Sequence, residues 1–208
     1  MKRCVIIGAV EIDFPVSHLI KETDYVICAD KGWQNALSRG IKPDMIVGDF
    51  DSSPYPETAD VSVTVLPVVK DDTDTFHIAR YVVENGYTDV LMLGLIGGKR
   101  IEHTIANIQT LVYFADNRIN ATAMDRFSTL MVIKDGMVVL PDMPGKFFSL
   151  FSMGDRAEGV TIKGAKYPLA DYTVTNSFPI GVSNEFIGET VEISVKNGSL
   201  LLIVTEKD

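Results

Sequence analysis

The order of hydrophobic and polar positions divides the chain into two parts. In the first part, short apolar runs rich in β-branched residues predict buried strands at 4–9, 25–29, 45–47, 61–67 and 89–95. Segments with apolar residues at helical spacing occur at 31–39, 74–85 and 102–117. Alternating strands and helices with short connections are typical of a mostly parallel sheet with helices on both faces.

The same pattern predicts how two of these helices begin and pack. We expect Asp30 to cap the first helix, because a carboxylate there accepts a hydrogen bond from the free N–H groups of the first turn. The last helix should present one apolar side to the sheet, made by Ile105, Ile108, Leu111, Val112 and Phe114.

The pattern changes after about residue 120. Asp135-Gly136 and Asn197-Gly198 each lie between two apolar runs. Such pairs predict β-hairpins, because both central residues of the favoured turn need positive φ. Further short strands are expected at 147–153, 159–169 and 172–178. The sequence thus predicts an α/β domain over residues 1–122, followed by a small antiparallel β-sandwich over residues 123–208.

Charge and cysteine content narrow the choice of partners. The chain has 208 residues, a net charge of −9 and a sequence pI near 4.8. An acidic protein repels nucleic-acid backbones and anionic membrane surfaces, and no apolar run approaches the roughly 18 residues of a membrane helix. Cys4 and Cys28 sit in apolar strand-like runs, which favours reduced core cysteines. We therefore expect a cytoplasmic protein with no nucleic-acid or membrane partner.

Polar residues gather after the predicted strands, at 48–53, 68–74 and 96–103. Parallel α/β sheets bind ligands beyond the carboxyl ends of their strands. These segments hold both carboxylates and cations: Asp49, Asp51, Asp71, Asp72, Asp74 and Glu102, with Lys70, Lys99 and Arg100. Crowded carboxylates repel one another unless a cation joins them, and oxygen ligands suit Mg²⁺. Asp49 and Asp51, one residue apart, can both point at one Mg²⁺.

The remaining motif evidence is less specific. The segment "IGGKR" (96–100) offers backbone N–H groups and Arg100 to phosphate oxygens at a helix start, but alone it is as typical of a plain turn. The chain has neither the P-loop nor the Rossmann glycine spacing. Each acidic motif alone is typical of solvated loop residues or a helix cap. Their occurrence at three strand ends favours a functional site.

Five motifs in chain order resemble those of the thiamine pyrophosphokinase family: "ADKG" (29–32), "GDFDS" (48–52), "KDDTD" (70–74), "GGKRIEH" (97–103) and "GVSNE" (181–185). The second and third are specific, and the others are supportive. The resemblance covers nearly the whole chain and implies an α/β nucleotide domain followed by a β-sandwich. It also implies a homodimer, with thiamine bound where the β domain of one subunit meets the α/β domain of the other.

The resemblance further implies that a pyrophosphoryl group passes from ATP to thiamine, giving thiamine diphosphate and AMP. It assigns Mg²⁺ binding to Asp49, Asp51 and Asp74, and catalysis to Asp49, Asp51, Asp71, Asp74 and Arg100. It assigns nucleotide binding to Asp30, Lys70, Thr73, Arg100, Glu102 and His103. Thiamine binding falls to Ser183 and Asn184.

The motifs leave two other functions open. The segment "DFDS" is also an Asp-x-Asp phosphatase signature with Asp49 as nucleophile. The second open function is a sensor that binds a nucleotide or thiamine without turnover. Every acidic position that matches the family still carries a carboxylate, which counts against a sensor. Two residues depart from the family pattern. Lys31 replaces the first glycine after Asp30, and Glu102 replaces an aspartate and is one methylene longer.

Overall fold

The computed structural model covers residues 2–50, 55, 61–67 and 71–207. Asp51 and Lys70, two residues of the predicted site, lie outside these ranges. The chain forms two compact units, Met1–Arg126 and Phe127–Asp208. None of the helices within the described ranges is both long enough and apolar enough to span a membrane.

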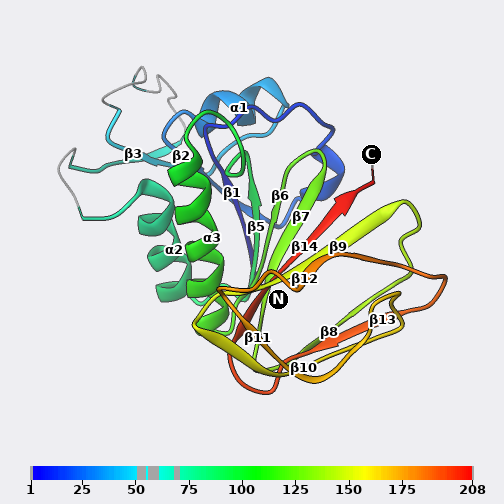
Figure 1. Cartoon of the computed structure of the whole chain (residues 1–208). Coiled ribbons are helices and arrows are strands. Elements are labelled where there is room, and N and C mark those ends of the chain that lie inside the picture. The colour runs from blue at the N-terminus through cyan, green and yellow to red at the C-terminus, as the bar shows by residue number, and fades with distance from the viewer. Residues whose placement is uncertain (1, 51–54, 56–60, 68–70, 208) are drawn as a thin grey trace. The chain divides into compact units, whose positions relative to one another are not determined.

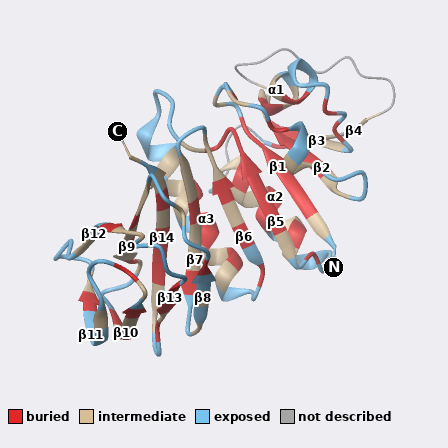
Figure 2. Cartoon of the chain, turned by 90° about the vertical axis from the view of Figure 1, so that its right-hand side faces the viewer, coloured by how far each residue is buried: buried red, intermediate tan, exposed pale blue. Residues whose placement is uncertain are grey.

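A parallel sheet forms the centre of the N-terminal unit (Figure 1). Its described strands are β1 (Arg3–Ile7), β2 (Tyr25–Ala29), β3 (Met45–Gly48), β4 (Ser62–Val65), β5 (Asp89–Leu93) and β6 (Asn120–Met124). They lie in the order β6-β5-β1-β2-β3-β4, and each neighbouring pair is parallel. Apolar runs form the central strands because both faces are covered, and Cys4, Ile6 and Ile7 of β1 are fully buried (Figure 2).

Helices cover both faces of this sheet, as predicted. On one face, Ala36 of α1 (Gly32–Ser38) is buried in a cluster with Val5 and Ile7 of β1. The helices α2 (Asp74–Glu84) and α3 (Ile101–Asp116) pack side by side (Figure 1). Crossovers between parallel strands are right-handed, so the direction of a crossover along the sheet decides which face its helix covers. The crossover β2–β3, which contains α1, runs in one direction, and the crossovers β4–β5 and β5–β6, which contain α2 and α3, run in the other. The helices α2 and α3 therefore lie on the face opposite to α1. A 3-10 helix, η1 (Ser17–Leu19), separates β1 from β2 in the chain.

The buried side of α3 differs from the prediction. Ile105 exposes 54% of its surface, so its predicted place on the inner side is wrong. The buried residues are Asn107, Thr110, Leu111 and Phe114. Both polar residues are satisfied inside, because Asn107 donates to the carbonyl of Leu95 and Thr110 to that of Ala106. A pattern of apolarity cannot identify a helix face that contains bonded polar residues.

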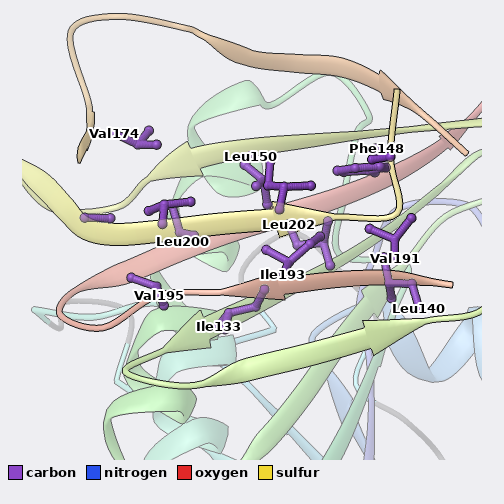
Figure 3. Close-up of a cluster of buried hydrophobic side chains, with 14 of the residues drawn as sticks. Ile133, Leu140, Phe148, Leu150, Val174, Val191, Ile193, Val195, Leu200 and Leu202 are labelled. Carbon is purple, nitrogen blue, oxygen red and sulfur yellow. The ribbon is translucent and has the colours of Figure 1, made fainter. Parts of the chain in front are cut away.

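The C-terminal unit consists of two antiparallel sheets around one apolar core (Figure 3). Its strands are β7 (Ser128–Lys134), β8 (Met137–Leu140), β9 (Lys146–Ser152), β10 (Arg156–Lys163), β11 (Leu169–Thr175), β12 (Gly181–Glu185), β13 (Val191–Ser194) and β14 (Ser199–Glu206). Within this unit, the strands of one layer pair in the order β12-β9-β14-β7 and those of the other in the order β11-β10-β13-β8. Leu150 and Leu202 of the first sheet meet Ile193 of the second in the core. The predicted β-sandwich is therefore confirmed.

The two predicted hairpins within this unit are wrong. Because β7 pairs with β14 and β8 pairs with β13, the chain changes sheets at Asp135-Gly136 and again at Asn197-Gly198. The two turns bind each other instead. The Asp135 N–H donates to the Gly198 carbonyl (3.1 Å), and the Gly198 N–H donates to the Asp135 carboxylate (2.8 Å). A turn signal predicts a change of direction but not the strand that the chain pairs with afterwards.

Candidate functional site

A pocket of about 720 Å³ lies at the carboxyl ends of the parallel strands. Residues that directly follow β1, β2, β3 and β5 line it, together with the first turns of α2 and α3. The strand order reverses at β1, which has β2 on one side and β5 on the other. Such a switch point is where open α/β sheets bind ligands, so the pocket occupies the expected place.

Asp30 and Asp49 enter this pocket from the ends of neighbouring strands. The Asp30 N–H donates to the carbonyl of Val47 (2.8 Å), and Asp30 has a left-handed backbone with a φ of 45°. The predicted capping role of Asp30 is wrong: Lys31 is the N-cap of α1 and makes no side-chain cap bond. Since the backbone of Asp30 turns away before the helix begins, its carboxylate lines the pocket instead.

Gly32 explains why α1 can start so close to the strand ends. A Cβ on Gly32 would lie 2.0 Å from the carbonyl oxygen of Ile7, so no other residue fits without a shift of the backbone. Lys31, which replaces a glycine of the family pattern, has an ordinary helical φ of −61°. The shape of this turn therefore depends on Gly32 and tolerates a side chain at position 31.

Phe50 determines how the chain leaves β3 after Asp49. Its φ of 54° is uncommon for a residue with a side chain, and its ring packs against the core cluster on the α1 side of the sheet. Because such backbone strain persists where packing fixes it, the half-buried ring holds the turn that directs Asp49 toward the pocket. Asp51, the next residue, lies outside the described residues.

The start of α2 supplies the second group of acidic residues. Thr73 is the N-cap, and its hydroxyl accepts a hydrogen bond from the Phe76 N–H (3.1 Å). Asp72, Thr73 and Asp74 all line the pocket, and Asp72 also forms an ion pair with Arg80. The Asp74 Oδ1 atom is shielded from solvent. Asp71 is exposed and is not among the described lining residues.

The loop before α3 and its first turn form the basic side of the pocket. Lys99, Arg100 and His103 line it. Glu102 does not, among the described residues, but the Arg100 guanidinium donates to its carboxylate (2.7 Å). This hydrogen bond lowers the pKa of Glu102 below its usual value. The pair is largely exposed, so solvent screens it and an incoming anion can compete for Arg100.

The composition of the pocket fits a hydrated divalent cation that is held together with phosphates. Half-buried Asp30, Asp49 and Asp74 bring carboxylate oxygens to one cavity, where their mutual repulsion favours a cation. Among the described residues, no group of three His, Cys, Asp or Glu side chains forms a complete metal site. Mg²⁺ commonly takes one or two carboxylates and completes its coordination with water and substrate phosphate. The donor set therefore suits Mg²⁺.

The motifs do not indicate two asparagines that contact the pocket loops. Asn35 of α1 donates to the carbonyls of Gly8 and Val10, and Asn107 of α3 donates to that of Leu95. All three bonds join residues that are distant in sequence. A helical asparagine on a partly buried side is the signal that could have pointed to them, because a buried amide requires hydrogen-bond partners.

Ser183 and Asn184, the predicted thiamine-binding residues, lie on β12 in the C-terminal unit. The pairing of β12 with β9 is irregular between Gly181 and Asn184, and Ser183 has a left-handed φ of 58°. Ser183 is exposed, whereas Asn184 exposes 5% of its surface. The Asn184 amide accepts from the Tyr167 N–H (3.0 Å) and donates to the Tyr167 carbonyl (2.7 Å). The side chain of Ser183 is thus exposed to solvent, whereas that of Asn184 is buried and bonded to the backbone of Tyr167.

Comparison with known families decides between the interpretations of these motifs. Residues 16–123 match the family model of the thiamin pyrophosphokinase catalytic domain. Residues 137–200 match that of the vitamin B1 binding domain of thiamin pyrophosphokinase.

The chain belongs to the thiamin pyrophosphokinase family. The family and the enzyme class that the motifs predicted, a thiamine diphosphokinase, are confirmed. Thiamine pyrophosphokinase of Bacillus subtilis is 27% identical over 183 residues, which cover 85% of each chain.

Solved structures of the thiamin pyrophosphokinase family share the fold. The Bacillus subtilis enzyme superposes with a TM-score of 0.89 at 24% identity over 100% of both chains. The Geobacillus thermodenitrificans enzyme gives 0.86 at 24% identity, covering 99% of this chain and 98% of its own. The Candida albicans enzyme gives 0.83 at 17% identity, covering 99% and 89%. The predicted fold class of an α/β unit with a β-sandwich is thereby confirmed.

Proposed function

We propose that this chain binds ATP and Mg²⁺ in the pocket of the N-terminal unit and there transfers the pyrophosphoryl group of ATP to thiamine. One observation carries the proposal. The carboxylates of Asp30, Asp49 and Asp74 share a single cavity with the cations of Lys99 and Arg100, at the switch point of a parallel sheet. This is the arrangement that a metal-bound polyphosphate requires.

In the proposed reaction, the hydroxyl oxygen of thiamine attacks the β-phosphorus of ATP. The bond between the β-phosphorus and the oxygen that bridges to the α-phosphorus breaks, and AMP leaves. Phosphoryl transfer depends mainly on positioning and charge neutralisation. A bound Mg²⁺ would supply the positive charge that neutralises the phosphates. Asp49, Asp51 and Asp74 are proposed to hold it, and Asp71 or Asp74 to accept the proton of the attacking hydroxyl.

The basic residues of the pocket are proposed to bind the phosphate chain. Arg100 presents a fork of N–H donors that matches phosphate oxygens, and its exposed partner Glu102 would release it as phosphate binds. Lys70 is proposed for the same task from its place in the sequence. Asp30, Thr73 and His103 line the same cavity. With Glu102, the partner of Arg100, they complete the proposed nucleotide-binding set.

Thiamine is proposed to bind at Ser183 and Asn184, at the interface of a homodimer. Two features of the C-terminal unit support an interface there. β12 pairs with β9 along one side, and apolar residues within and around it are exposed: Phe178, Ile180, Val182 and Ile187. Exposed apolar groups of this kind mark contact surfaces. Light scattering coupled to gel filtration should give twice the chain mass.

A cytoplasmic location is also proposed. Cys4 and Cys28 are fully buried and not joined to each other, which fits a reducing compartment. Equal labelling of both thiols in unfolded protein, with and without prior reduction, would support this, whereas labelling that requires a reductant would contradict it.

The decisive assay incubates the protein with ATP, Mg²⁺ and thiamine and separates the products by chromatography. We expect AMP and thiamine diphosphate in equal amounts, and neither product when EDTA is present or thiamine is omitted. Release of inorganic phosphate from monoesters would instead favour the phosphatase. Thiamine binding without any turnover would favour the sensor.

A further inference from the structure

Two loops meet in the wall of the nucleotide pocket at the switch point of the sheet. Residues 8–11 follow β1 and residues 94–98 follow β5, and both segments contribute to the lining. The Gly8 N–H donates to the Leu93 carbonyl (2.8 Å), and the Val10 N–H donates to the Gly94 carbonyl (2.9 Å). A Cβ on Gly8 would lie 2.5 Å from the Gly94 oxygen. The two loops are therefore in close contact, and a shift of either changes the pocket wall.

Asn35 holds the first loop from one face of the sheet. Its Nδ2 donates to the carbonyls of Gly8 (2.7 Å) and Val10 (2.8 Å). The amide nitrogen has two hydrogens, so both are used in binding this loop. Asn35 is not itself among the described residues that line the pocket. It can thus affect the pocket through the backbone that it binds.

Asn107 holds the second loop from the opposite face. Its Nδ2 donates to the Leu95 carbonyl (2.6 Å), and the residue exposes 5% of its surface. Unlike Asn35, Asn107 also lines the pocket, but its amide nitrogen is bonded to this loop. One turn earlier on α3, the Thr104 hydroxyl accepts a hydrogen bond from the Gly97 N–H (3.0 Å). Since a buried carbonyl that loses its donor is costly, the loop follows the position of α3.

We propose that Asn35 and Asn107 are positioning residues, which keep the loops at 8–11 and 94–98 in the shape that accepts the phosphates of ATP. The identity of the ligand rests on the proposed function. A pocket that adopts its binding shape for a fraction of the time loses apparent affinity in proportion to that fraction. Losing either amide should therefore weaken ATP binding more than it slows the chemical step.

The variants Asn35→Asp and Asn107→Ala test this role. In Asn35→Asp, a carboxylate of the same shape faces two carbonyl oxygens without a hydrogen to donate. Both variants should raise the KM for ATP, and the Kd of a non-hydrolysable ATP analogue, by about 10-fold. The values of kcat and of the KM for thiamine should stay within about 2-fold of the parent.

Asn117→Ala is the matched control. Asn117 lies at the end of α3, its Nδ2 donates to the Tyr113 carbonyl (2.8 Å), and it does not line the pocket. The variant thus removes an asparagine amide-to-carbonyl bond at the end of the same helix, but an exposed bond that holds no pocket loop. We expect it to change the melting temperature slightly and to leave the KM for ATP unchanged.

Amide hydrogen exchange on the ligand-free protein provides a second readout. Exchange should accelerate at 8–11 in Asn35→Asp and at 94–98 in Asn107→Ala, and at neither loop in Asn117→Ala. Folded variants with a lower melting temperature but unchanged loop exchange and unchanged KM for ATP would overturn the proposal. A parent protein that binds ATP but forms no AMP would overturn the proposed function alone, because analogue affinity and loop exchange would still decide the role of the two asparagines.

Discussion

The pocket of the N-terminal unit and the β12 strand of the C-terminal unit use their polar motif residues in different ways. In the pocket, Asp30 and Asp49 lie in turns beyond the strand ends, and their carboxylates line a cavity. On β12, the amide of Asn184 is buried and bonded to the backbone of Tyr167 on both sides. The side chain of a motif residue can thus line a cavity, or it can form hydrogen bonds with the backbone of a neighbouring segment.

This difference separates the expected effects of mutation. A carboxylate that lines a pocket is repelled by its neighbours, so removing it should cost activity and spare stability. Removing a polar group whose donors and acceptors are all used in buried hydrogen bonds should lower the free energy of unfolding. The Arg3–Asp24 ion pair is a second example of a polar group with a structural role. It lies in the same unit as the pocket but binds none of the described pocket residues.

The largest effect is expected for Asp49→Asn. Loss of one charge that stabilises the transition state typically lowers kcat by about 10²–10³-fold. The melting temperature should stay equal or rise, since a repulsive carboxylate is gone. Steady-state rates of AMP formation and a thermal melt measure the two quantities. The matched control is Asp116→Asn, an exposed position at the far end of α3, and equal kcat values for the two variants would contradict the account.

Next in size is Arg3→Met, which removes the cation from a buried carboxylate. The Arg3 guanidinium donates to Asp24 at 2.5 Å, and the Asp24 side chain is 1% exposed. Breaking such a pair costs about 3 kcal/mol of unfolding free energy. Urea denaturation measures it. The KM for ATP in the folded variant should match the parent, and a change in KM without a loss of stability would refute the structural role.

The same pair predicts an acid-labile part of the stability. Burial raises the pKa of Asp24, but hydrogen bonds from the Arg3 guanidinium and the Lys21 N–H outweigh it and hold the pKa below its usual value. A carboxyl with a lowered folded-state pKa stabilises the fold above its ordinary pKa, and this stability is lost as the pH falls through the folded-state value. Urea unfolding between about pH 5 and pH 2 should therefore show a steeper loss in the parent than in Asp24→Asn. Parallel curves would contradict the prediction.

On β12, Asn184→Ala should lower the unfolding free energy by about 2 kcal/mol, because the buried Asn184 amide and its two hydrogen bonds to the Tyr167 backbone are lost. Its neighbour provides the control. Ser183→Ala should change stability by less than about 0.5 kcal/mol, as is usual for exposed positions. If Ser183 contacts thiamine as proposed, Ser183→Ala raises the KM for thiamine. Equal unfolding free energies of the two variants, measured by urea denaturation, would contradict a structural role for Asn184 that Ser183 lacks.

A gain of stability, smaller than the loss in Asn184→Ala, is expected for Ser183→Gly. Ser183 has a φ of 58°, and glycine adopts this conformation without strain. We expect a gain of about 1 kcal/mol in unfolding free energy. The bond from the position-183 N–H to the Ser149 hydroxyl is a backbone bond and is retained. Differential denaturation against the parent detects this change, and a loss of stability would show that the side chain of Ser183 has a structural contact.

The sequence predicts the N-terminal unit better than the C-terminal unit for a physical reason. Strands buried on both faces are apolar runs, which local pattern detects. β6 lacks this signal, since Asn120–Met124 alternates small and polar residues. The predicted boundary between residues 122 and 123 falls inside this strand. The failed hairpins at Asp135-Gly136 and Asn197-Gly198 show the same limit, because strand pairing in a sandwich depends on partners far along the chain.

The candidate site shows what motifs reveal and what they miss. Acidic motifs after predicted strands point to Asp49 and Asp74, and the family resemblance points to Asp30; all three line the pocket. Asn35 and Asn107 were missed, since their partners are backbone carbonyls distant in sequence. Every residue has a backbone carbonyl, so the sequence does not indicate which carbonyl a side chain binds. Such a contact can be identified when the fold is known.

Pyrophosphoryl transfer to thiamine is proposed to take place in the pocket of the N-terminal unit. The most direct test supplies ATP labelled with ³²P at the β-phosphate, together with Mg²⁺ and thiamine, to the parent and to Asp49→Asn. The account predicts that the parent moves the label into thiamine diphosphate while unlabelled AMP appears, and that Asp49→Asn does so at least about 100-fold more slowly. Label that remains in ADP, or transfer at the parent's rate by Asp49→Asn, would contradict it.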